Sequence, residues 1–111
     1  MGHLYLSSNF YKFDPVEELI KIRDLIAHCH IHDNFGKASY FNEKQQNQLI
    51  PFGKGDSYMP IGWGIIPFET MLKTFIDNYK GILVMEIRNR YFRHMEESRK
   101  KFTQNNIKIS F

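Results

Sequence analysis

Three histidines alternate along one short stretch of the chain, at His28, His30 and His32. In a β-strand, successive side chains point to opposite faces, so these three imidazoles would share one face. A solvated polar face is the commoner explanation for alternating polar residues. Three imidazoles within five residues favour a different role, because they can hold a metal ion or transfer protons.

A single carboxylate, Glu86, interrupts the apolar run at residues 82–87. An unpaired carboxylate is costly to bury, so Glu86 needs a cation, a set of hydrogen bonds or a raised pKa. It could instead emerge at a strand end and meet Arg88 or Arg90 in water. The residues alone do not decide between these two interpretations.

Imidazole and carboxylate donors without a thiolate suit a divalent ion such as Zn, Mn, Co or Mg. Cys29 is the chain's one cysteine, and its apolar neighbours predict a buried side chain that faces away from the adjacent histidines. A cysteine nucleophile is therefore disfavoured. Zinc-finger spacing, a phosphate-binding loop and a dinucleotide fingerprint are all missing from the sequence.

Helices and strands that would position these residues alternate along the chain. Asp14 and Pro15 are typical of a helix start, with Asp14 as the cap. The predicted elements are an opening at 1–13, a helix to about residue 24, a strand at 25–32, a long functional loop at 33–66, a helix from Pro67 to about residue 78, a strand at 82–87 that is apolar on both faces, a helix at 91–102 and a tail at 103–111.

This order predicts one α/β domain over residues 1–111 with parallel strands. A doubly wound sheet and a barrel segment both fit the pattern. In a barrel, polar groups at the carboxyl ends of the strands converge on the active site. His30, His32 and Glu86 all occupy such ends.

The formal charge of +3 includes a modest basic cluster at residues 88–101, which also contains Glu96 and Glu97. A nucleic-acid surface is one interpretation, but a solvated helix face explains the same residues and is favoured. The single cysteine predicts a reducing compartment. Because neither a membrane-spanning run nor a signal peptide is evident, we expect a cytoplasmic protein.

Four segments in order resemble the xylose-isomerase-like TIM barrels: residues 2–3, 28–34, 60–68 and 83–87. That family includes sugar phosphate isomerases and epimerases and metal-dependent apurinic-site endonucleases. The resemblance covers most of the chain up to about residue 102. It implies a partial (β/α)8 barrel, in which the parallel strands and their helices represent the sixth to eighth βα units.

The resemblance also implies roles for individual residues. His30 and Glu86 match metal ligands of the family, and Glu86 would in addition be a catalytic acid or base. His3 matches a histidine that contacts substrate. Trp63 would stack on a sugar at the mouth of the site, although a buried loop anchor is an equal alternative.

Three further residues are candidates for a supporting role or for an extra metal: His28, His32 and Asp56. The endonuclease branch has an Asp and a His two residues apart that serve a further metal. Asp56 matches the first position, but Tyr58 occupies the second. This departure places the sugar branch ahead and disfavours a nucleic-acid partner.

We therefore expect a fragment of a metal-dependent sugar or sugar phosphate isomerase or epimerase, which transfers a proton next to a carbonyl. The family's strand-six Asp would fall immediately before Met1, and its strand-five Glu would lie further upstream. The chain alone should be inactive, and its partners would be a sugar or sugar phosphate and the missing N-terminal half of the barrel or a second copy. The alternatives are an endonuclease-like fragment and a non-catalytic remnant.

Overall fold

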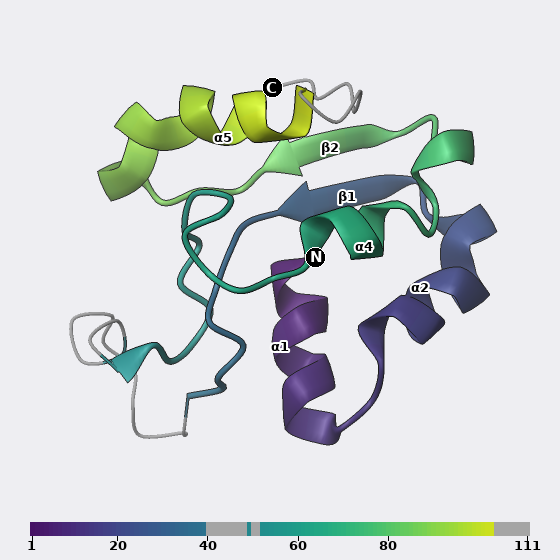
Figure 1. The fold of residues 1–111 in the computed structure, drawn as a ribbon, viewed down its shortest axis with the longest axis horizontal. Helices are drawn as coiled ribbons and strands as arrows, with labels where there is room; N and C mark the ends of the chain where they lie inside the picture. The colour runs from purple at the N-terminus through teal and green to yellow at the C-terminus, as the bar shows by residue number, and fades with distance from the viewer. Residues whose placement is uncertain (40–48, 50–51, 104–111) are drawn as a thin grey trace.

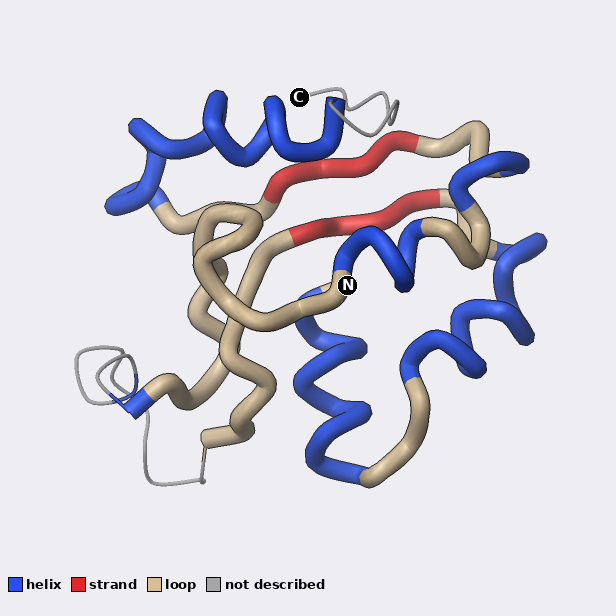
Figure 2. The backbone as a smooth tube through the Cα atoms, viewed as in Figure 1, coloured by secondary structure: helices blue, strands red, loops and turns tan. Residues whose placement is uncertain are grey.

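The structure, a computed structural model, describes residues 1–39, 49 and 52–103. Two strands, β1 (His28–Ile31) and β2 (Ile82–Met85), pair in parallel, and helices flank them as Figures 1 and 2 show. The helices are α1 (Gly2–Tyr11), α2 (Pro15–Ile22), η1 (Arg23–Leu25), α4 (Phe68–Leu72), η3 (Ile76–Asn78), η4 (Asn89–His94) and α5 (Met95–Thr103). The predicted α/β class with parallel strands is confirmed.

The register of the two strands separates their side chains into an apolar and a polar face. Cys29 pairs with Leu83 and Ile31 with Met85, and these side chains pack in or against the core. His28 and His30 pair with Ile82 and Val84 on the opposite face. The predicted alternation of the histidines with small and apolar residues is confirmed.

The second strand is less covered on its histidine-side face than the sequence predicts. The pattern predicts a strand that is apolar and covered on both faces, but Ile82 keeps 51% of its surface exposed. The prediction was wrong because α5 and α4 pack with the Leu83 side of the sheet through Phe102 and Phe68, whose rings lie 5.8 Å apart. The part of the histidine-side face that carries His28 and His30 stays accessible.

Helix α2 begins where the sequence predicts. The Asp14 side chain accepts a hydrogen bond from the Val16 N–H at 2.8 Å, and Pro15 occupies the first turn. Leu19 carries the buried face of the helix into the core.

Helix α1 replaces the irregular opening that the sequence predicts for residues 1–13. Its residues have almost no amphipathic period, and Gly2 and Ser8 are its buried members. The helix ends at Lys12, whose left-handed backbone (φ 61°) directs its N–H to the Ser8 carbonyl. Tertiary contacts at the Met1 end, rather than an apolar stripe, select this helix.

The helix predicted from Pro67 to about residue 78 is shorter than expected. Its apolar stripe is buried, with Met71 and Leu72 fully inside, but the α-helix ends at Leu72. The Thr74 hydroxyl donates to the Met71 carbonyl at 2.7 Å, and this competes with a continuing helical bond. The chain continues as a 3₁₀ turn at Ile76–Asn78.

The predicted C-terminal helix appears as η4 followed by α5, and the long loop at 33–66 is crossed by an isolated antiparallel bridge between Asp33 and Met59. Residues 40–48, 50–51 and the tail at 104–111 lie outside the described residues. Among the helices that the structure describes, none has the length and apolar character to span a bilayer.

Candidate metal centre

His30 and Glu86 meet at the carboxyl ends of the two strands. His30 is in β1, and Glu86 directly follows β2, where its N–H donates to the Ile31 carbonyl at 2.9 Å and continues the strand pairing. His30 Nδ1 lies 3.2 Å from Glu86 Oε2. Their side chains are 44% and 40% exposed, so a ligand can reach both.

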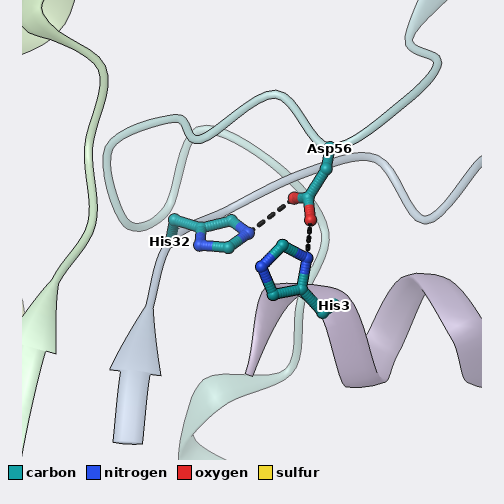
Figure 3. A group of neighbouring side chains, drawn as sticks. All are labelled: His3, His32 and Asp56. Carbon is teal, nitrogen blue, oxygen red and sulfur yellow. Dashed lines mark hydrogen bonds and ion pairs between the residues drawn. The ribbon is translucent and has the colours of Figure 1, made fainter.

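A second grouping lies beside this pair and is built from three separate segments. Figure 3 shows His3 from the first turn of α1, His32 just past β1 and Asp56 from the long loop, with both rings pointing at one carboxylate. His32 Nε2 is 2.5 Å from Asp56 Oδ1, and His3 Nδ1 forms an ion pair with Asp56 Oδ2. We call these three residues the His–Asp cluster.

His32 connects the cluster to the pair. Its side chain is fully buried, and while Nε2 faces Asp56, Nδ1 has no hydrogen-bond partner among the described residues. Glu86 Oε2 lies 3.7 Å from this nitrogen, beyond hydrogen-bond length. Buried polar atoms are rarely left unpaired, so the nitrogen between the two groupings suggests a place for a further partner.

The donor atoms of the His–Asp cluster fit a divalent ion. One ligand atom from each residue lies within 4.8 Å of the others. Two imidazoles and a carboxylate are donors that Zn and neighbouring divalent ions accept. The sequence interpretation places His32 and Asp56 among candidates for an extra metal, but it assigns His3 to substrate.

Charge interactions in the cluster act on the Asp56 carboxyl. Burial tends to raise the pKa of Asp56, but the hydrogen bond and charge of His32, the charge of His3 and the Asn34 amide outweigh it, so the pKa lies below its ordinary value. The carboxylate is thus held ionised, as a metal ligand must be.

Tyr58 covers one side of the cluster. Its ring stacks on His32 with a centroid distance of 4.2 Å, and its hydroxyl lies 3.4 Å from His3 Nε2. Burial and the nearby Asp56 and Glu86 carboxylates raise the Tyr58 pKa. The phenol therefore stays protonated at neutral pH, and its hydroxyl can form hydrogen bonds at this side of the cluster.

Asp33 fixes the loop behind the site, and the sequence interpretation gives it no role. Its buried carboxylate accepts backbone N–H groups from Gly62 at 2.8 Å, Gly64 at 2.9 Å and Ile66 at 3.3 Å. Gly64 must be glycine because a Cβ there would overlap the Asn34 carbonyl. An acid directly after a predicted strand was the available signal.

Asn34 is the second supporting residue that sequence reasoning missed. Its side-chain amide donates to the Gly2 carbonyl at 3.1 Å and to Asp56 Oδ1 at 3.3 Å. Asn34 thereby ties α1 and the Asp56 loop to the end of β1. Gly2 leaves room for this, since a Cβ at that position would overlap the His32 ring.

The remaining predicted residues lie around this centre. His28 Nε2 is 2.9 Å from His30 Nε2, and His28 is exposed one pleat earlier in the strand. A supporting role for His28 stays a prediction. Trp63 packs on Tyr91 and His94, with ring centroids 5.4 and 4.7 Å away. Trp63 also keeps 38% of its surface exposed, so sugar stacking and a buried loop anchor both stay predictions. Cys29 faces the apolar side, where burial raises its pKa.

Comparison with known proteins agrees with this arrangement. A model of the xylose isomerase-like TIM barrel family matches residues 1–107. No sufficiently similar protein was found among curated proteins or solved structures. The structure has parallel strands, histidines along one face and a carboxylate at the end of the second strand. The chain belongs to the xylose isomerase-like TIM barrel family.

Proposed function

We propose that this chain supplies part of the metal-dependent active site of a sugar or sugar phosphate isomerase or epimerase. The observation that carries the proposal is the approach of His30 and His32 to one oxygen of Glu86, at 3.2 and 3.7 Å, where two parallel strands end. His30, Glu86 and the adjacent His–Asp cluster are the residues that would hold divalent ions. Such an ion supplies polarisation of substrate hydroxyl and carbonyl oxygens.

Glu86 is the residue proposed to move the proton. Its carboxylate is 40% exposed and faces the open side of the sheet, so it can reach a carbon acid next to a carbonyl. His30 holds Oε2 in place by its Nδ1 contact. Tyr58 keeps a neutral hydroxyl beside His3, where it can donate to a substrate oxygen.

A proton transfer between two faces of a carbon needs a second acid or base. Family resemblance assigns that role to a carboxylate outside these 111 residues, and the two strands in the described part of the chain cannot by themselves close an eight-stranded barrel. We propose that a further barrel segment or a second copy completes the site. Support comes from an apolar hollow of about 300 Å³ beside β1, lined in part by Met1, Leu19 and Leu25.

A manganese titration followed by electron paramagnetic resonance tests the metal part of this proposal. Glu86→Gln and His30→Gln should each weaken the binding of an ion by about tenfold, since supporting or ligating groups contribute at least this much. Glu17→Gln on the surface of α2 is the matched control and should bind as the wild type does. Titrations that neither site substitution changes would contradict the proposal.

Turnover of a panel of ketoses and ketose phosphates with Mn, Co, Mg or Zn tests the catalytic part. The isolated chain should show none, because one of two acid/base groups is worth roughly a hundredfold to ten-thousandfold in rate. Activity that disappears in Glu86→Gln would show that the 111 residues build a complete site, and size-exclusion chromatography would then tell whether a homo-oligomer forms it.

An apurinic-site phosphodiesterase is a second candidate function, which the His–Asp cluster favours. Asp56 matches the first residue of the Asp and His pair that serves a further metal in the endonuclease branch, and it lies beside His3 and His32. Against it stands Tyr58, a phenol where that branch has a histidine. Cleavage of abasic DNA by the chain with added zinc would place it in that branch.

A further inference from the structure

Two arginines closely follow Glu86 on the chain. Arg88 and Arg90 are exposed, and neither has a carboxylate partner within the described residues. With Asn89 between them they line an open hollow of about 450 Å³. Two guanidinium groups and an amide around one hollow are donors that match the oxygens of a phosphate.

Arg88 is held on the same side as the His–Asp cluster. Its N–H donates to the Tyr58 carbonyl at 3.1 Å, and its guanidinium carbon lies 5.3 Å from the centre of the Tyr58 ring. The same ring stacks on His32. One aromatic ring therefore separates a fixed positive charge from the candidate metal ligands.

Two of the other basic residues of this region are paired with acids. On α5, Arg99 pairs with Glu96 and Lys101 pairs with Glu97. A nucleic-acid groove would need a continuous run of free cations, which these internal pairs interrupt. Arg88 and Arg90 line one hollow together, and this local charge suits one phosphate group.

We infer that Arg88, Asn89 and Arg90 form a phosphate subsite, and that the substrate of this centre is a phosphorylated sugar. That the substrate is a sugar rests on the proposed function, whereas its phosphate group is inferred from the arginine geometry. In an open-chain sugar phosphate the ester lies at the opposite end from the carbonyl. The subsite would hold that end while the carbonyl end lies at Glu86 and His30.

Calorimetric titration of the full chain with inorganic phosphate, in the presence of a chelator that removes metal ions, tests the subsite. Arg88→Gln and Arg90→Gln should each weaken phosphate binding by about tenfold, the effect of losing one charged hydrogen bond. Arg93→Gln, the same change on the next exposed arginine of η4, is the matched control and should leave affinity unchanged. Binding should also weaken as salt is added.

Two further measurements separate the phosphate subsite from the metal site and from a nucleic-acid surface. Glu86→Gln should keep phosphate binding in the chelator, so loss of metal binding in that variant leaves the subsite standing. Absence of phosphate binding, or equal weakening by Arg93→Gln, would overturn the inference. A single-stranded oligonucleotide that binds more tightly than a ketose phosphate and depends on all three arginines would overturn it in favour of nucleic acid.

Discussion

The His30–Glu86 pair and the His–Asp cluster use the same kinds of donor but are built differently. Strand register alone brings the pair together, since both residues lie at the ends of neighbouring parallel strands. The cluster needs α1, β1 and the long loop to meet, with His32 fully buried and Asp56 only 15% exposed. Solvent reaches both residues of the pair, whereas protein encloses two of the three cluster residues and leaves His3 62% exposed.

This contrast in burial indicates which grouping should bind an ion tightly and which should do chemistry. A preorganised set of ligands loses little entropy when an ion arrives, and Asn34 and Tyr58 hold the buried His32 and the mostly buried Asp56 in place. An exposed carboxylate next to a histidine can reach substrate but fixes a metal less firmly. We expect the cluster to dominate metal affinity and the pair to dominate proton transfer.

Asp56→Asn should give the largest effect on metal binding. Replacing the carboxylate that both imidazoles share removes the anionic ligand, so zinc affinity should fall by more than about a hundredfold, beyond the range seen for supporting residues. Glu86→Gln should cost only about tenfold in the same competition assay with a zinc indicator. Equal losses in the two variants would remove the distinction between cluster and pair.

Tyr58→His should strengthen metal binding by about tenfold, the gain expected if the imidazole becomes a ligand. The Tyr58 ring already lies against His32 and His3, and its left-handed backbone (φ 50°) is one that histidine adopts more readily than most residues. Cobalt absorption bands would report the change in coordination. Tyr58→Phe, which adds no ligand, is the control and should not tighten binding.

Acid should destabilise the metal-free protein through Asp56. Its pKa in the folded chain lies below the ordinary value of 3.8, so the ionised form stabilises the fold above that value. This contribution is lost as the pH falls through the lower folded pKa. Thermal melts in a chelator should show Asp56→Asn losing less stability between pH 5 and pH 2.5 than the wild type, and parallel pH profiles would contradict this.

The smallest expected effect is that of Glu86→Gln on the stability of the fold. Because the His30–Glu86 contact is exposed, its loss should change the free energy of unfolding by less than about 0.5 kcal/mol. Urea unfolding of the metal-free protein measures this change. A loss of several kcal/mol would mean that the pair supports the fold as well as the chemistry.

Features that depend on neighbours along the chain follow directly from the amino-acid sequence. Asp14 and Pro15 begin α2 because capping is local. Alternation at His28 and His30 follows from the period of a strand, and a carboxylate at the end of an apolar run predicted the position of Glu86. The His30–Glu86 pair could therefore be predicted from the sequence alone.

The His–Asp cluster and its support depend instead on tertiary contacts. His3 lies on a helix that has almost no amphipathic pattern, and Asp56 lies in a loop without periodicity, so no local signal places either against His32. Asp33 and Asn34 gain their roles from bonds to Gly62, Gly64 and Gly2, which are distant in sequence. Burial and hydrogen-bond satisfaction are properties of the whole fold. They decide that His32 is buried between the two groupings while His30 stays exposed.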